Sequence, residues 1–373
     1  MAYRILVASY TDAVYTLLFD PLKSVDESLS LLSKLTVGHH PSWIEHHPSD
    51  PAIIFAGLEQ EDGRLLTLRY SGGIEEGQII ANVSSRGADP CSILATDENI
   101  FVANYSSGSV GIFDLPSTEH PASVESQSPL RFSGSGPCTE RQVSSHPHQV
   151  YFAKRGSAAT LGPTDEILVP DLGSDKVWRL SQNAEGKWEK KSEITYNLHL
   201  GGGPRHVVVH ESKLYTLMEL AKKITVHDFR NPGSNPPLLA EAVLPAPDDL
   251  KPLTMLAAEI LCPAPNPTFP DAYIYVSNRN DPRPHGDLIS IFSVHKDGQT
   301  ALERIGDVPT GLAHVRGFLF FGPDDRYVVV GGANGGGVKV FERINRGRSM
   351  REVAHLPASD GAAGLAPTAF LVL

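Results

Sequence analysis

The chain has 373 residues, of which 41% are hydrophobic and 20% are charged, a composition typical of a soluble globular protein. The formal net charge of -11 argues against nucleic-acid binding, which usually depends on a basic face. Three widely spaced cysteines argue against a disulfide framework and a zinc site, and no segment reaches the roughly 18 consecutive apolar residues of a membrane helix. The N-terminal residues do not resemble a secretory signal, so we expect a cytoplasmic protein without membrane contact.

A repeated pattern of short strands runs through the chain in place of helical periodicity. Each copy has an apolar strand, a second strand that ends in a polar residue, a turn, and a third strand that ends in an aromatic residue. The chain begins with only two such strands, RILVASY and VYTLLFD, within residues 4–20. Complete copies follow at residues 42–70, 90–115, 147–180, 204–229, 258–294 and 315–344.

The last residues, TAFLVL (368–373), form a spare strand that completes the N-terminal copy. Seven copies over this length give roughly 50 residues per copy, the period of a β-propeller blade. We therefore predict an all-β fold, a single seven-bladed propeller domain over residues 1–373, in which the C-terminal strand joins the N-terminal blade. A β-sandwich would explain neither the repeat nor the split copy. Residues 116–145, 154–165 and 280–287 are expected to be loops, and whether the first of them acts as a lid stays open.

Polar residues recur at two positions of the predicted blades, the start of the first strand and the end of the second. In antiparallel blades these two positions meet at the same face of the ring, so we expect the side chains to gather at one mouth of the central channel. The residues at these positions are Trp43, Glu59, Asn104, Tyr105, His148, Asp171, Arg205, His206, Glu219, Asn278, Arg279, His314, Arg316 and Asn334.

This set favours a small anionic substrate and proton transfer. Arginine recognises carboxylate or phosphate with two hydrogen bonds, and histidine and glutamate exchange protons. Structural roles in edge hydrogen bonds or ion pairs remain open for each residue taken singly. The histidines of GHHPSWIEHHP (38–48) lack a metal-site spacing, and GGANGGGVKVF (331–341) precedes a strand and not a helix. We therefore expect no metal and no cofactor.

The chain resembles the seven-bladed propeller lactonase family, which includes a bacterial type of 6-phosphogluconolactonase and the fungal 3-carboxy-cis,cis-muconate lactonizing enzymes. The motifs that carry the resemblance are HPHQV (146–150), VPDLGSDKV (169–177), GGGPRHVVVH (201–210), LMEL (217–220), VSNR (276–279) and VRGF (315–318). Motif by motif, the resemblance implies that the catalytic residues are His148, Arg205, Glu219 and Arg279. Arg316 lies in VRGF, where Val315 replaces the proline that the phosphogluconolactonase branch usually has.

Two cofactor-independent reactions fit these residues. In lactone hydrolysis, Glu219 or His148 would be the base and His206 a proton donor, while Arg205, Arg279 and Arg316 would hold a phosphate and the oxyanion. In the cyclisation of 3-carboxymuconate, the arginines would bind carboxylates and His148 would be the better acid. The further candidates for substrate contact are Asn278, Asp171, Asn104 and Tyr105. A non-catalytic propeller that binds proteins is a third hypothesis; we favour lactone hydrolysis.

Overall fold

The computed structural model describes the chain apart from a few short segments. The described residues are 1–70, 77–117, 120, 122–153, 165–196, 199–230, 235–294, 302–358 and 364–373. The insertion predicted at 154–165 therefore lies almost wholly outside the described residues. The helical segments include two 3-10 turns, η2 (Pro323–Asp325) and η3 (Asn345–Gly347). No described helix has the length and apolar character needed to cross a membrane.

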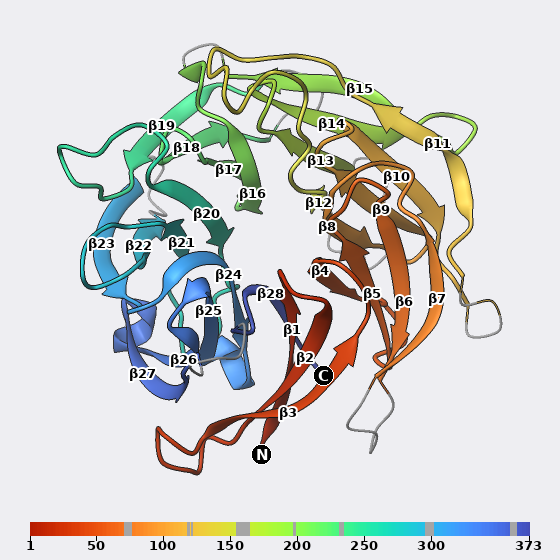
Figure 1. Cartoon of the computed structure of the whole chain (residues 1–373). Coiled ribbons are helices and arrows are strands. Elements are labelled where there is room, and N and C mark those ends of the chain that lie inside the picture. The colour runs from red at the N-terminus through yellow and green to blue at the C-terminus, as the bar shows by residue number, and fades with distance from the viewer. Residues whose placement is uncertain are drawn as a thin grey trace. The chain divides into compact units, whose positions relative to one another are not determined.

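Twenty-eight strands form seven four-stranded antiparallel sheets, which are the seven predicted blades (Figure 1). The chain divides into two compact units, and each is described by itself. Unit 1 comprises Met1–Ile44, Gly72–Gly77 and Ala240–Leu373, and unit 2 comprises Glu45–Ser71 and Gln78–Leu239. The prediction of a single domain over residues 1–373 stays a prediction.

Three sheets lie in unit 1. In spatial order their strands are β28 (Pro367–Val372), β1 (Tyr3–Ser9), β2 (Ala13–Phe19), β3 (Leu29–Thr36); β20 (Leu256–Leu261), β21 (Tyr273–Arg279), β22 (Leu288–Val294), β23 (Leu302–Pro309); and β24 (Ala313–Phe321), β25 (Tyr327–Gly335), β26 (Gly337–Ile344), β27 (Ser349–Leu356).

Four sheets lie mainly in unit 2. Their strands are β4 (Pro41–His46), β5 (Ile53–Leu58), β6 (Arg64–Arg69), β7 (Gln78–Ser84); β8 (Pro90–Ala95), β9 (Asn99–Asn104), β10 (Ser109–Asp114), β11 (Glu125–Arg131); β12 (Tyr151–Ala153), β13 (Glu166–Asp171), β14 (Lys176–Gln182), β15 (Trp188–Thr195); and β16 (Pro204–His210), β17 (Lys213–Met218), β18 (Lys223–Asp228), β19 (Leu238–Val243).

The two ends of the chain share one sheet, as the split copy predicts. β28 pairs antiparallel with β1, with Ile5 opposite Val372 and Val7 opposite Phe370. Phe370 packs in the same apolar cluster as Ile5 and Val7. The C-terminal strand therefore completes the N-terminal blade, and that prediction is confirmed.

Burial differs between the strands of one blade. The second strands are apolar on both faces, and every residue of β5, β9, β13 and β21 is buried. The fourth strands are largely exposed: β19 has no buried residue, and β3 has one. β11 falls inside residues 116–145, so the expectation of a continuous loop there is wrong. A half-exposed polar strand lacks the apolar run by which the other strands can be recognised.

Within unit 2, side chains of one blade accept hydrogen bonds from backbone amides at the edge of the next blade. The Gln149 side-chain oxygen accepts a hydrogen bond from the Val207 amide at 2.7 Å, and the Tyr151 hydroxyl accepts one from the Val209 amide at 3.0 Å. Because an unpaired buried amide costs free energy, these two bonds fix β16 beside β12. They therefore position the start of β16, where Arg205 lies.

Candidate active site

A β-bulge brings two neighbouring residues of β16 to the same place. Along a regular strand, successive side chains point to opposite faces. The pairing of β16 with β17 shifts between Pro204 and His206, so the strand is irregular at Arg205. Arg205 and His206 are both buried, and Arg205 Nη1 lies 3.3 Å from His206 Nε2. Bulges re-aim side chains in this way and are common beside active sites.

Glu219 joins two arginines in a buried ion-pair group. It follows β17 directly, and its side chain is fully buried. Arg205 Nε lies 3.1 Å from Glu219 Oε2, and Arg141 Nη2 lies 2.7 Å from Glu219 Oε1. Two cations and one carboxylate leave a net charge of about +1 on this group, of which Arg205 and Glu219 are buried, and such a charge attracts an anion.

Tyr105 and three histidines lie beside this group in unit 2. The ring of His148 meets that of His206 edge-on, with 5.3 Å between centroids, and that of Tyr105 edge-on at 5.5 Å. Tyr105 also stacks flat on His146 at 4.4 Å. The predicted residues Tyr105, His148, Arg205, His206 and Glu219 therefore come together in the structure.

Arg141 is a member of this group that the sequence analysis missed. It lies in the segment 116–145, which has no repeat pattern and was expected to be a loop. Its guanidinium also lies near the Tyr105 hydroxyl. Burial lowers the pKa of Arg141, but Glu219 and Tyr105 raise it, and the net result is a pKa above the ordinary value. The weak signal in the sequence was an arginine seven residues before His148.

Residues 136–146, which we call the strap, are held in place mainly by Gln142. The Gln142 side chain is buried and donates to Asp175 Oδ1 at 2.7 Å and to the Leu172 carbonyl at 2.8 Å. Asp175 also accepts from the amides of Gly201 at 2.6 Å and Gly203 at 2.9 Å. One carboxylate thus fixes both the strap that carries Arg141 and the turn that leads into β16.

Asp171 and Asn104, both predicted to contact substrate, are fully buried and occupied by their own unit. Asp171 accepts bonds from Ser145 Oγ at 2.5 Å and Trp178 Nε1 at 2.8 Å, and also from three backbone amides. Asn104 exchanges hydrogen bonds with Ser85, at 2.8 Å and 3.1 Å. Both side chains thus stabilise the surrounding fold of unit 2, because their polar atoms already form hydrogen bonds within it.

Asn278, Arg279 and Arg316 belong to unit 1. Asn278 accepts a bond from the Leu288 amide at 2.6 Å and donates one to Asp281 at 3.1 Å. Burial opposes the ionisation of Asp281, but hydrogen bonds from Arg283 and Asn278 leave the pKa of this carboxyl below its ordinary value. Arg279 ends β21 and is buried, with a relative exposure of 4%.

Arg316 lies near the start of β24, next to a second bulge. The pairing of β24 with β25 shifts between Val315 and Phe318. The guanidinium carbon of Arg316 lies 4.9 Å from the centroid of the Tyr10 ring, a cation–π contact. Tyr10 in turn lies 5.1 Å from the His40 ring. This contact orients the guanidinium from one face, and its edge carries the hydrogen-bond donors.

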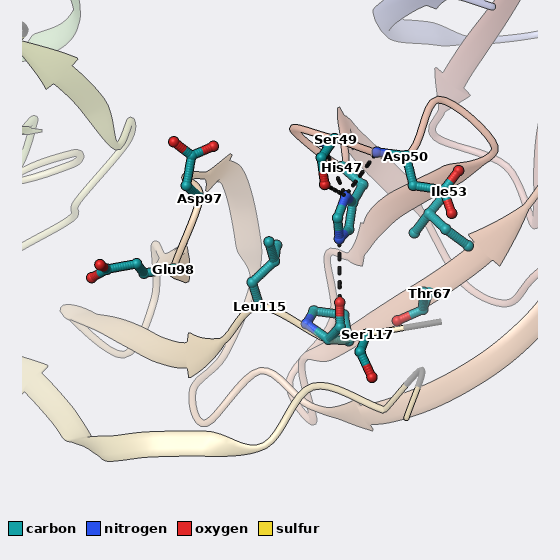
Figure 2. A pocket seen from close by; sticks show the side chains of 10 residues that line it. His47, Ser49, Asp50, Ile53, Thr67, Asp97, Glu98, Leu115 and Ser117 are labelled. Carbon is teal, nitrogen blue, oxygen red and sulfur yellow. Dashed lines mark hydrogen bonds between the residues drawn. The ribbon is translucent and has the colours of Figure 1, made fainter. Parts of the chain in front are cut away.

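A separate pocket of about 540 Å³ lies at the opposite ends of the strands in unit 2 (Figure 2). It is lined by His47, Ser49, Asp50, Ile53, Thr67, Asp97, Glu98, Leu115, Pro116 and Ser117. Figure 2 shows His47 bonded through both ring nitrogens: Nδ1 accepts the amides of Ser49 and Asp50 at 3.2 Å and 3.1 Å, and Nε2 donates to the Pro116 carbonyl at 3.2 Å. None of the predicted site residues lines this pocket. The hydrogen bonds of His47 stabilise the local backbone.

No group of three or more His, Cys, Asp or Glu side chains suited to a metal ion occurs among the described residues.

A family model described as "Lactonase, 7-bladed beta-propeller" matches residues 4–362. The chain belongs to this family. A 6-phosphogluconolactonase of Yersinia pseudotuberculosis is 32% identical over 145 residues, which are 38% of this chain and 40% of that relative. The match thus spans less than half the length of the curated relative.

Solved structures show the same fold along the whole chain. A periplasmic gluconolactonase of Pseudomonas aeruginosa superposes with a TM-score of 0.79 at 21% identity and covers 100% of this chain and 99% of that one. A protein from Lactobacillus plantarum gives a TM-score of 0.78 at 22% identity, with 100% of both chains covered. This lactonase-family chain is therefore a seven-bladed β-propeller, and the fold class predicted from its repeats is confirmed.

Proposed function

We propose that the protein hydrolyses a sugar lactone, with 6-phosphogluconolactone as the first candidate substrate. Membership of the lactonase family and the names of its relatives support a lactone-ring reaction. The observation that carries the proposal is the buried group of Arg205, Glu219 and Arg141 beside His148 and His206. Net positive charge next to imidazoles that can accept and pass on protons is what ester hydrolysis without a cofactor requires.

In this scheme His148 is the base. It takes a proton from water as the water oxygen forms a bond with the lactone carbonyl carbon. The ring C–O bond then breaks, and the proton that His148 took from water passes through His206 to the oxygen of the leaving alkoxide. The new carboxylic acid ionises, so each turnover releases one proton into solution.

Glu219 is a positioning residue in this proposal. The sequence leaves Glu219 and His148 open as the base. Arg205 and Arg141 face the two oxygens of the Glu219 carboxylate, and its side chain is fully buried. A carboxylate held between two cations has little tendency to take up a proton from water. We therefore assign Glu219 to the orientation of the two arginines.

Arg279 and Arg316 keep their predicted role as binding residues for the anionic part of the substrate. The expectation of a cytoplasmic location also stays a prediction, and one structural neighbour is named as periplasmic. The cycloisomerase and scaffold hypotheses are tested by the experiment below.

A pH-stat assay with fresh 6-phosphoglucono-δ-lactone tests the function against the spontaneous rate. We expect clear acceleration by the native protein. Arg279→Ala should lower kcat/KM by about 10- to 100-fold, because a charged hydrogen bond is worth roughly 1.5–3 kcal/mol. Arg304→Gln is the matched control, since Arg304 is 43% exposed and pairs with the surface residue Asp307.

No acceleration by the native protein would contradict the proposal. The loss of 3-carboxymuconate ultraviolet absorbance would then support the cycloisomerase, and inactivity on both compounds would leave the scaffold hypothesis.

A further inference from the structure

Arg141 has N–H donors available for a ligand, although it already contacts Glu219 and Tyr105. A guanidinium carries five N–H groups. In the described part of the chain, Arg141 donates to Glu219 Oε1 at 2.7 Å, and its guanidinium lies near the Tyr105 hydroxyl. Its side chain is 28% exposed, whereas those of Arg205 and Glu219 are 3% and 0% exposed. Arg141 is therefore the member of the ion-pair group with N–H donors left for a ligand.

Tyr105 is prepared to act with it. The Tyr105 hydroxyl lies near the Arg141 guanidinium, so the two groups can donate to the same acceptor. Burial raises the pKa of Tyr105, and the contact with Arg141 only partly opposes this, so the phenol stays protonated at neutral pH. The ring meets that of His148, the proposed base, edge-on at 5.5 Å. Two donors thus lie beside the group that would activate water.

The strap makes these donors rigid. The Arg141 and Gln142 amides donate to the Cys138 carbonyl at 2.9 Å and 2.7 Å, and Gln142 is bonded to Asp175. The His146 amide is bonded to Asp171 at 2.7 Å. Donors that are fixed before the reaction need no reorganisation when charge develops in the transition state.

We propose that Arg141 and Tyr105 form the oxyanion-binding pair of the lactone hydrolysis proposed above, on which this assignment rests. The carbonyl oxygen becomes negative when water adds to the carbonyl carbon. One guanidinium N–H and the phenol O–H would each donate a hydrogen bond to it. The net charge of about +1 on Arg205, Glu219 and Arg141 matches one oxyanion better than a phosphate dianion, which argues for the carbonyl end of the substrate.

The test compares Arg141→Gln, Arg141→Lys and Tyr105→Phe on two substrates, 6-phosphoglucono-δ-lactone and glucono-δ-lactone. Loss of one oxyanion donor costs about 10²- to 10³-fold in kcat. We expect Arg141→Gln to lower kcat by this factor equally on both lactones, with little change in KM. Arg141→Lys should recover part of it, and Tyr105→Phe should lower kcat without lowering Tm. Arg230→Gln is the control, because Arg230 is 72% exposed and pairs with Asp228 at the surface of the same unit.

Three results would overturn the assignment. A native kcat in Arg141→Gln would contradict the oxyanion assignment and would leave the proposal of lactone hydrolysis intact. A rise in KM confined to the phosphorylated lactone would make Arg141 a phosphate ligand. No acceleration of either lactone by the native protein would remove the proposed function and this assignment together. If Arg141→Gln does not fold, Arg141→Lys and Tyr105→Phe decide by the same criteria.

Discussion

His227 lies on β18 as a buried imidazole, in a pocket of about 300 Å³ that it shares with Tyr196 and His199. The Tyr196 ring meets it edge-on, with 5.2 Å between centroids. Burial, and then the charge of His199, lowers the pKa of His227 from 6.5 to about 4. This residue therefore stays neutral in the folded protein at a pH where an exposed histidine is largely protonated.

Stability should consequently fall as the pH is lowered from 6.5 to 4. In this window the unfolded chain binds a proton at His227 and the folded chain does not, so acid favours unfolding. The contribution reaches about 3 kcal/mol below pH 4, because one pKa unit corresponds to about 1.4 kcal/mol. Urea unfolding of the native protein and His227→Phe at several pH values measures it. The variant should lose this part of the acid dependence, whereas the exposed control His120→Asn should not. Parallel pH profiles of His227→Phe and the native protein would contradict this account.

At the residue scale, the sequence analysis predicted which residues lie at strand ends more accurately than it predicted what those residues do. Tyr105, His148, Arg205, His206 and Glu219 lie together because the blade repeat places strand starts and strand ends at one level. The same positions also hold Asp171 and Asn104, whose polar atoms are used by Ser145, Trp178 and Ser85. No repeat could point to Arg141, because the strap is outside the repeat and its position depends on Gln142.

At the scale of elements, Asp175 connects the strap to the turn before β16. Asp175 Oδ1 accepts from Gln142 and from the Gly203 amide, and Oδ2 accepts from the Gly201 amide. Gly203 has a φ of +66°, and an added Cβ would lie 2.7 Å from the Leu220 side chain, so glycine is required there. The carboxylate thus holds a turn that has little freedom to adjust.

Asp175→Asn should lower both stability and activity. The asparagine amide would direct N–H donors toward at least one of the groups that now donate to the carboxylate, and the lost charged hydrogen bonds should cost about 1.5–3 kcal/mol. Because the strap and β16 both loosen, kcat should fall although Asp175 touches no substrate. Urea unfolding and the pH-stat assay measure the two effects. Asp114→Asn, at an exposed strand end, is the control. A variant with native stability and native kcat would show that Asp175 does not couple these elements.

The sequence predicted three strands of each blade but not their irregularities. First, second and third strands have apolar runs that are buried, whereas every residue of the fourth strands β7, β11 and β19 is exposed or half-buried. Bulges at Arg205 and near Arg316 change which way side chains point, and one sequence has no signature for them. The pairing partners that create a bulge become visible only in the sheet.

At the scale of the whole molecule, the fold depends on the sheet that both chain ends share. β28 provides the hydrogen-bonding partner of β1, and Phe370 packs in the cluster of Ile5 and Val7. Thr368 Oγ1 also donates to the Ser42 carbonyl at 2.8 Å, which connects β28 to the start of β4. Without β28, β1 would become an exposed apolar edge strand, which favours aggregation.

Deletion of residues 366–373 should therefore abolish cooperative unfolding or lower Tm severely, because the loss of Phe370 alone is worth about 3–5 kcal/mol. The informative control moves the same residues to the other end of the chain. Val372 lies opposite Ile5 in an antiparallel pair, so a short turn between the moved strand and β1 would form a hairpin with the native pairing. Thermal unfolding and size-exclusion chromatography should show a monodisperse, cooperatively unfolding protein for the rearranged chain and an aggregating one for the deletion. If the deleted chain unfolds as cooperatively as the native one, β28 is not needed to complete the blade; if the rearranged chain also fails, the covalent order of the strands matters beyond their pairing.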